Sequence, residues 1–252
     1  MKVATWNVNS LKVRLPHLLE WLAANPVDVI CLQETKQQDA DFPQVELEKA
    51  GYHAVFNGQK TYNDVAILSR FPPGEVQRGI PGLADEQRRL IAATCDGVRV
   101  ICAYMPNGES IGSDKYQYKL KWLAALNEWL KAELQKHPRL VLLGDYNIAP
   151  EDRDVYDPQA WAGSVLCSEP ERAAFRGLQQ LGLRDAYRLF DQPDKSYTWW
   201  DYRMMAFRRN MGLRIDHILI SQPLQCSACT IDKVPRRLER PSDHTPVIAE
   251  IE

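Results

Sequence analysis

The amino-acid sequence predicts an α+β protein in which two β-sheets pack face to face and helices cover their outer surfaces. Short apolar runs of strand length recur along the chain, and an Asp-Gly pair at 96–97 separates two of them, as in a tight antiparallel hairpin. Helical patterns lie between the runs at irregular intervals, which disfavours a doubly wound parallel sheet. The 252 residues contain no evident linker or repeat, so a single domain over residues 1–252 is expected.

Each expected strand is an apolar run rich in β-branched residues, either continuous or alternating with polar residues. These runs are 3–8, 27–32, 52–56, 65–68, 90–95, 98–104, 140–143, 215–220 and 247–251. Leucines spaced three and four residues apart predict helices within 11–22 and 113–136. A third helix is expected to begin at Ser168, because Glu171 can complete a capping box with it, and to end at Gly182.

Composition limits the possible partners and the compartment. The formal net charge of −2 argues against a generally polycationic nucleic-acid coat, so an anion site has to be local or assisted by a metal. The stretch MKVATWNVNS lacks the apolar core of a secretion signal, and no later run reaches membrane-spanning length, so a cytoplasmic protein without membrane association is expected. Six scattered cysteines suit reduced packing residues, and the C-x-x-C of Cys226 and Cys229 is interpreted as two strand thiols rather than a zinc site.

Polar residues of one chemical kind follow several of the expected strands. A single Asp at a strand end is usually a turn or a helix cap, but several acids and amides ending different strands favour a shared counter-ion, because burying each acid alone is costly. Carboxylate and amide oxygens suit Mg²⁺, and no Cys or paired His nearby suits zinc. The sequence therefore predicts a Mg²⁺ site, whose candidate ligands are Asn7, Glu34, Asp145, Asn147 and Asp243.

Six motifs, in order across nearly the whole chain, point to a known family: WNVNS, LQETK, YMPN, GDYNIAP, LRIDHIL and SDHTPV. With these motifs the sequence resembles the exonuclease III type of apurinic/apyrimidinic (AP) endonuclease, in the superfamily with the deoxyribonuclease I-like fold. The resemblance implies a four-layer α/β/β/α sandwich with two mixed, mainly antiparallel sheets. It also implies an enzyme that uses Mg²⁺, with Mn²⁺ as a substitute, and acts on double-stranded DNA. Such an enzyme cuts 5′ of abasic sites and removes nucleotides or blocking groups from recessed or damaged 3′ ends.

The resemblance also implies roles for the residues at matching motif positions. Glu34 and Asp243 are the implied metal ligands, with Asn7 nearby. Asp145 is implied to position or deprotonate the attacking water. A metal and donors aimed at the phosphate oxygens lower the barrier that the anionic phosphodiester presents to a nucleophile.

Four further residues are implied to act on the scissile phosphate. Asn147 and Tyr104 would contact it, and His244, oriented by Asp216, would stabilise the pentacovalent centre. The general base stays open at this point. Either Asp145 or the pair of His244 and Asp216 suits that role, because a carboxylate that holds a histidine in one tautomer is also the arrangement of a base.

DNA contacts are implied for loops around the site. Lys36 and the TYND segment 61–64, which includes Tyr62 and Asn63, align with family loops near the phosphate backbone. Asn107 aligns beside the scissile phosphate, and Asn9 is grouped with these DNA-contacting residues. Three basic clusters are candidates for phosphate contact, although any one of them is equally well a solvated face: Lys115, Lys119 and Lys121; Arg203, Arg208, Arg209 and Arg214; and Lys233, Arg236, Arg237 and Arg240.

The segment 197–216 is aromatic, then Met-rich and basic, then apolar, which is typical of a loop that enters a groove beside a pocket. The resemblance implies that Trp199, Leu213 and Ile215 wall a small pocket for a flipped-out abasic sugar. Leu213 stands where several relatives have Trp, which would loosen the pocket and shift the balance between abasic-site cleavage and exonuclease action. The three methionines of the segment either enter the groove or pack under the loop.

Asp64 departs from the family pattern, in which Gly usually occupies this position. A positive φ angle there would be tolerated less well by Asp, and its charge would lie near a DNA phosphate. The hypothesis is that Asp64 weakens or re-routes the DNA contact.

Two alternative functions keep the same fold. One is a phosphoesterase that acts on a lipid or inositol phosphate. The other is a catalytically weak or dead regulator that binds nucleic acid, which the presence of every expected catalytic residue disfavours. The sequence leaves open the ratio of endonuclease to exonuclease activity, the number of metal ions and the protein partners. A monomer is expected, because no oligomerisation device is visible.

Overall fold

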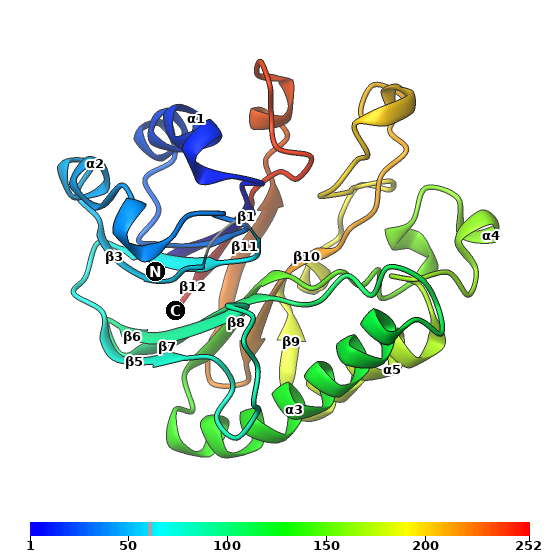
Figure 1. Ribbon diagram of the computed structural model, residues 1–252, viewed down its shortest axis with the longest axis horizontal. Helices are drawn as coiled ribbons and strands as arrows, with labels where there is room; N and C mark the ends of the chain where they lie inside the picture. Colours follow the sequence, from blue (N-terminus) through cyan, green and yellow to red (C-terminus); the bar gives the residue numbers. More distant parts are fainter. Residues whose placement is uncertain (60–61) are drawn as a thin grey trace.

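The protein is built from two β-sheets with helices on the outer face of each. The computed structural model describes residues 1–59 and 62–252, so Thr61 of the TYND segment lies outside the described residues. Figure 1 shows the two sheets facing each other, with α1 and α2 on one side and α3 and α5 on the other. The four-layer α/β/β/α sandwich expected from the sequence is confirmed.

The first sheet has the strand order β11-β12-β1-β2-β4-β3. Its strands are β1 (Lys2–Asn7), β2 (Val29–Gln33), β3 (His53–Asn57), β4 (Val65–Ser69), β11 (Cys226–Ile231) and β12 (Val247–Ile251). β1 and β2 pair in parallel, and the other neighbours are antiparallel. The first and last strands of the chain therefore lie side by side.

The second sheet has the strand order β5-β6-β7-β8-β10-β9. Its strands are β5 (Gly74–Arg78), β6 (Leu90–Cys95), β7 (Val98–Tyr104), β8 (Leu140–Asp145), β9 (Leu183–Asp185) and β10 (Asp216–Ser221). β7 and β8 are its parallel pair. Asp96 and Gly97 have φ angles of 47° and 73° between β6 and β7, so the expected tight hairpin is confirmed.

The α-helices are α1 (Leu11–Ala24), α2 (Gln44–Lys49), α3 (Asp114–Lys136), α4 (Pro158–Trp161) and α5 (Glu169–Gln180). Short 3₁₀ turns are η1 (Asp39–Asp41), η2 (Asp152–Asp154), η3 (Ala186–Leu189), η4 (Arg203–Met205) and η5 (Pro235–Arg237). The capping box of Ser168 and Glu171 begins α5 as expected, and Gly182 follows its end with a φ angle of 95°. Among the described residues, none of the helices combines the length and the apolar character needed to span a bilayer.

Strand β8 shows how the layers fix the position of the polar strand ends. Val141 and Leu143 face the core between the two sheets, and Leu140 and Leu142 face the core beneath α3 and α5. A strand that is buried on both faces reads as a continuous apolar run, which explains the sequence pattern. Asp145, the last residue of β8, therefore lies at the end of a rigid strand that is buried on both faces.

The expected elements exist with shifted ends, and several short elements were not predicted. Strand ends differ from the expected ones by at most two residues, which is the usual uncertainty. The edge strands β5 and β9 and the helices α2 and α4 contain few apolar residues, so they show no periodic signal. Cys226 and Cys229 belong to β11, as the interpretation of strand thiols expected.

Gly144 allows β8 to lie against β7 just before Asp145. Its φ angle is 152°, and a Cβ atom built there would lie 1.8 Å from the carbonyl oxygen of Ala103 in β7. Because neither strand can move away without breaking the parallel ladder, we expect Gly144→Ala to lower the free energy of unfolding by about 4 kcal/mol or more, as measured by urea denaturation.

Gly79 is the matched control for this substitution. It also has a positive φ angle, 69°, but a Cβ atom there would meet no heavy atom within 4 Å. Gly79→Ala is therefore expected to add only local backbone strain, about 1 kcal/mol. Equal losses in the two variants would show that the contact with Ala103 does not matter.

Candidate active site at the strand ends

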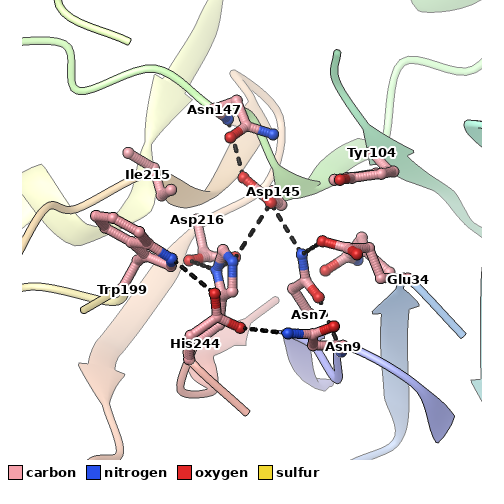
Figure 2. Close-up of polar contacts among 12 residues, drawn as sticks. Asn7, Asn9, Glu34, Tyr104, Asp145, Asn147, Trp199, Ile215, Asp216 and His244 are labelled. Carbon is pink, nitrogen blue, oxygen red and sulfur yellow. Dashed lines mark hydrogen bonds and ion pairs between the residues drawn. The ribbon is translucent and has the colours of Figure 1, made fainter. Parts of the chain in front are cut away.

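The polar residues that end or follow β1, β2 and β8 converge at one edge of the two sheets, beside the loop that precedes β12. Figure 2 shows Asn7, Glu34, Asp145 and His244 pointing toward one another. Among the described residues, one ligand atom each from Glu34, Asp145 and His244 lie within 4.8 Å of one another, as in a metal site. The two facing sheets therefore assemble the site together.

Asp145 is buried at the centre of this group and its carboxylate is bonded on both oxygens. Oδ2 accepts a hydrogen bond from the side-chain amide of Asn7 at 2.9 Å. Oδ1 accepts one from the backbone N–H of Asn147, also at 2.9 Å. Nε2 of His244 lies 3.7 Å from Oδ2. These contacts hold the carboxylate in one orientation.

His244 is held from its other ring nitrogen by Asp216. Nδ1 lies 2.9 Å from Oδ2 of Asp216, which is the pairing expected from the sequence. Two hydroxyls that the sequence did not suggest support this pair. Thr198 Oγ1 accepts the backbone N–H of Asp216 at 3.1 Å, and Ser242 Oγ accepts that of His244 at 3.2 Å. A hydroxyl residue in a loop carries no periodic signal by which it could have been found.

Glu34 links the amide of Asn7 to Lys36. Its Oε1 accepts from Asn7 at 2.9 Å, and its Oε2 lies 2.9 Å from the ammonium of Lys36. That ammonium also donates to Oδ1 of Asn9 at 2.6 Å. Asn9, Glu34, Lys36 and Asn147 all have φ angles between 44° and 52°. Such left-handed residues are uncommon outside glycine, and their clustering here is typical of a functional site.

Asp243 adjoins this group but faces other partners. Its Oδ1 accepts from Asn9 at 2.9 Å, and its Oδ2 accepts from the indole N–H of Trp199 at 2.9 Å. Of the five ligands expected from the sequence, the structure thus brings Glu34 and Asp145 into the group, with Asn7 bridging them through its N–H groups. The side-chain oxygen of Asn147 accepts from Asn107 at 3.1 Å instead.

Burial and neighbouring charges shift the pKa values of the site in opposite directions. Burial alone lowers the pKa of His244, but the carboxylates of Asp216 and Asp145 outweigh it and raise that pKa to about 10. Burial raises the pKa of Asp145 to about 7. The cationic His244 and the hydrogen bond from Asn7 favour the ionised form and partly offset this rise. Burial and the charges of Glu34 and Asp145 raise the pKa of Tyr104, so its hydroxyl remains a donor.

The basic clusters separate into exposed and buried members. Lys119, Arg214 and Arg236 are buried, so the expectation that they are candidates for phosphate contact is wrong for these three. Arg214, for example, lies 2.7 Å from Asp154 and 2.8 Å from Asp185. The other members have exposed or half-buried side chains: Lys115, Lys121, Arg203, Arg208, Arg209, Lys233, Arg237 and Arg240. Tyr62 is also exposed, whereas Asn63 is buried.

The apolar side of the site is formed around Trp199. Trp199 lines a cavity of about 360 Å³ together with Tyr156, Trp161 and Met211. Leu213 and Ile215 are buried behind this surface and pack against Trp199 in one cluster. The three residues therefore form one apolar cluster, of which Trp199 lines the cavity.

The loop after Trp199 exposes two methionines. Met204 and Met205 are 71% and 64% exposed, so they do not pack under the loop, and both have positive φ angles. Figure 1 shows this loop projecting beyond the sheets next to the loop that precedes β12. Both side chains are therefore open to solvent.

Asp64 has the positive φ angle that the sequence raised as a question, 76°. Its side chain is buried, and its two carboxylate oxygens accept the backbone N–H groups of Gln37 at 3.0 Å and Gln59 at 2.6 Å. The hypothesis of a charge that faces a DNA phosphate is therefore wrong. Asp64 instead ties together the two loops that contain Lys36 and Tyr62.

His217, next to Asp216, has a structural environment. Its Nε2 lies 2.9 Å from the carbonyl oxygen of Ile148, and its Nδ1 lies 3.0 Å from Arg214. Burial and the charge of Arg214 lower its pKa to about 4, despite Asp185 and Asp154. Since the unfolded chain binds this proton near pH 6.5, neutral His217 stabilises the fold above pH 6.5, and this contribution is lost as the pH falls to about 4.

We therefore expect His217→Gln to reduce the acid sensitivity of the protein. Gln can donate to Ile148 and accept from Arg214 without titrating. Between pH 7 and pH 4.5 the wild type should lose about 2 to 3 kcal/mol more stability than the variant, measured by urea denaturation at each pH. His53→Gln, at an exposed position in β3, is the control. Parallel pH profiles for wild type and His217→Gln would contradict the prediction.

A sandwich of two facing sheets, with carboxylates, amides and a His–Asp pair at one edge, is an arrangement suited to the hydrolysis of a phosphoester. The chain belongs to the Endonuclease/Exonuclease/phosphatase family, whose model matches residues 4–244. It is 38% identical to the exodeoxyribonuclease III of Haemophilus influenzae over 99% of each chain. The motif resemblance is thereby confirmed, and the protein is a hydrolase of this nuclease type.

Two solved structures are similar over the whole chain. The 3′ phosphatase NExo from Neisseria, bound to a product DNA hairpin, is 50% identical with a TM-score of 0.98, and the match covers 100% of this chain and 99% of that one. An AP endonuclease from Archaeoglobus fulgidus is 39% identical with a TM-score of 0.96, over 100% and 99% of the two chains.

Proposed function

We propose that this protein is a Mg²⁺-dependent phosphodiesterase of DNA repair that acts on the 3′ ends of double-stranded DNA, removing 3′ phosphates and terminal nucleotides. One observation supports it above all: the Asp145 carboxylate is held by Asn7 and Asn147, next to Glu34 and 3.7 Å from His244. The 50% identical relative from Neisseria is described as a 3′ phosphatase and as a 3′-5′ exonuclease. In this proposal residues 1–252 form one catalytic domain that works as a monomer.

The donor chemistry of the site fits a small divalent cation. Glu34 and Asp145 offer hard carboxylate oxygens that lie within 4.8 Å of each other. Asp243, which accepts a hydrogen bond from Asn9, is a further carboxylate nearby. Mg²⁺ is held by few carboxylates and keeps water and phosphate ligands. When bound, such an ion would neutralise the phosphate charge and polarise it for attack. Mn²⁺, with the same preference for oxygen ligands, would substitute.

Side chains of the protein carry out the other catalytic steps. Asp145, whose pKa is raised to about 7, takes the proton from the attacking water. His244 is cationic at neutral pH, because Asp216 and Asp145 outweigh burial and raise its pKa to about 10, so it stabilises the charge of the pentacovalent phosphorus rather than acting as the base. The hydroxyl of Tyr104 and the amide of Asn147 donate to the phosphate oxygens.

Polar and basic residues around the site, some exposed and some half-buried, hold the duplex. Lys36, Asn107 and Asn9 lie at its rim, and Tyr62 and Arg209 extend the contact surface outward. Trp199 provides an aromatic face beside the carboxylate of Asp243. Exposed cations are expected to make the affinity fall with salt concentration.

Cleavage 5′ of abasic sites is a second candidate function. The cavity of about 360 Å³ beside Trp199 favours it, because an apolar pocket next to the site is the feature that accepts an extruded sugar. The AP endonuclease from Archaeoglobus fulgidus is 39% identical to this chain. The two activities share the same catalytic groups and differ in the DNA that reaches them.

Labelled duplexes test both functions. The protein is incubated, with Mg²⁺ and then with EDTA, with duplexes that carry a 3′ phosphate, a recessed 3′ hydroxyl end or an internal abasic-site analogue. We expect Mg²⁺-dependent release of phosphate and nucleotides from the 3′ ends and loss of all activity in EDTA. Cleavage of only the abasic duplex would replace the first proposal by the second.

Two outcomes would reject a DNA nuclease altogether. Binding of the duplexes without any product would favour the regulator that binds nucleic acid. No binding and no product, together with phosphate release from an inositol phosphate, would favour the other phosphoesterase.

A further inference from the structure

Lys119 is a buried cation directly behind the active site. It lies in the first half of α3, and its side chain and that of its partner Glu171 in α5 are both 0% exposed. Lysine is almost never fully buried unless it is paired. The sequence grouped Lys119 with phosphate-contacting lysines, but no duplex can reach it. Its ammonium must therefore serve the protein itself.

The ammonium has three hydrogen-bond acceptors, one for each of its N–H groups. It lies 2.5 Å from Oε1 of Glu171, 2.6 Å from the backbone carbonyl oxygen of Asn147 and 3.1 Å from that of Asn107. The last two belong to the residues whose side-chain amides face the proposed phosphate position. One cation thus joins two loops that leave different strands, β7 and β8.

Glu171 is itself fixed in place. Its Oε2 accepts the backbone N–H of Ser168 at 3.1 Å, and its Oε1 accepts that of Leu166 at 3.0 Å. The hydroxyl of Ser168 lies 2.7 Å from that of Tyr116 in α3. The capping box that begins α5 therefore also anchors the acceptor for Lys119. The stem of Lys119 is enclosed as well, because a Cβ atom on Gly108 would lie 3.2 Å from its Cδ.

A chain of contacts runs from this ion pair to the reacting groups. The side-chain amide of Asn107 donates to Oδ1 of Asn147 at 3.1 Å, and that of Asn147 donates to the carbonyl oxygen of Met105 at 3.0 Å. The backbone N–H of Asn147 donates to Asp145 at 2.9 Å. Asn147 is also one of the residues with a positive φ angle, 49°, a conformation that persists only when its surroundings impose it.

We propose that Lys119 and Glu171 are positioning residues, which hold the backbone of Asn107 and Asn147 so that their amides and the Asp145 carboxylate keep the geometry needed for phosphodiester hydrolysis. The inference rests on the proposed nuclease function. A buried ion pair seldom stabilises a fold more than apolar residues of the same size would. Orientation of catalytic groups is a stronger reason for it, because a displacement of about 1 Å can lower a rate about 100-fold.

The test compares two ion pairs of the same helix. Arg99 and Glu133 form a second buried pair, 2.6 Å apart, at the other end of α3. Glu133 is 14 residues beyond Lys119, about 21 Å along the helix. Glu171→Gln and Glu133→Gln each remove one buried charge partner, so a purely structural role predicts similar losses of thermal stability and similar effects on activity.

Steady-state kinetics on the duplex with a 3′ phosphate separate positioning from stability. In Glu171→Gln we expect kcat to fall about 10- to 100-fold with KM within about threefold of the wild-type value. Glu133→Gln should keep the wild-type kcat at a temperature below both melting points. Lys119→Met should match Glu171→Gln, and Lys131→Met, at an exposed position further along α3, should match the wild type.

A second measurement is independent of activity. In ¹⁵N-labelled protein, the side-chain amide resonances of Asn107 and Asn147 should shift in Glu171→Gln and stay in place in Glu133→Gln. Wild-type kcat in Glu171→Gln, or equal losses in the two Gln variants, would overturn the positioning role while leaving the nuclease function intact. An inactive wild type would instead reject the nuclease function, and the amide resonances would then still show whether the ion pair holds the two loops.

Discussion

Asp145→Asn is expected to lower the turnover number by about 10² to 10⁴-fold while leaving the fold intact. A carboxamide can still accept the bond from Asn7, but it cannot take a proton and is a poorer ligand for a divalent cation than a carboxylate. The measurement is kcat on the duplex with a recessed 3′ end at saturating Mg²⁺. Thermal melting of the variant checks that the site alone has changed.

Asp152→Asn is the control, because this carboxylate is exposed and pairs with Arg172 away from the strand ends. It should keep the wild-type turnover number. A residual rate above one tenth of wild type in Asp145→Asn would show that Asp145 is neither the base nor an essential ligand. The pair of His244 and Asp216 would then be the better candidate for the base.

His244→Asn is expected to lower kcat by about 10² to 10³-fold, with a small effect on KM. The reason is the loss of a cation that would face the phosphate only when negative charge builds up in the transition state. Asp216→Asn should also lower kcat, because Asp216 lies 2.9 Å from Nδ1 of His244 and keeps the ring charged and oriented.

The double variant distinguishes a coupled pair from two independent residues. If Asp216 acts through His244, the double variant should be about as active as His244→Asn alone. Multiplied effects would show that Asp216 acts on its own. The pH dependence of kcat adds a second criterion. If Asp145 is the base, the rise of kcat with pH on the acidic side should remain in His244→Asn and disappear in Asp145→Asn.

Periodic apolar patterns predicted most of the fold. The continuous apolar run of β8 predicted its burial, and the Leu spacing predicted α1 and α3. Four short elements, β5, β9, α2 and α4, were not predicted. Their positions depend on contacts with the rest of the fold rather than on a local pattern. The capping box at Ser168 was predicted as a local feature, yet its tie to Lys119 could not be, since α3 and α5 meet only in the folded chain.

The motifs predicted the group at the site better than they predicted individual contacts. Glu34 and Asp145 come together as expected, but His244 rather than Asp243 completes the three-residue group. Lys119 and Asp64 were misjudged for the same reason: a sequence shows that a residue is charged but not whether it is buried and paired. Lys119 is paired with Glu171, and Asp64 accepts two backbone N–H groups.

The sequence by itself determined the two-sheet architecture, the family and the identity of the polar residues at the strand ends. Those properties depend on side-chain periodicity and on residue type, which are local. The tertiary structure alone decided which charges face solvent and which are buried, that Asp243 bonds to Trp199, and that Lys119 lies behind Asn147. Each of these depends on a distance between segments far apart in the chain, and only the packing of the two sheets and their helices sets such distances.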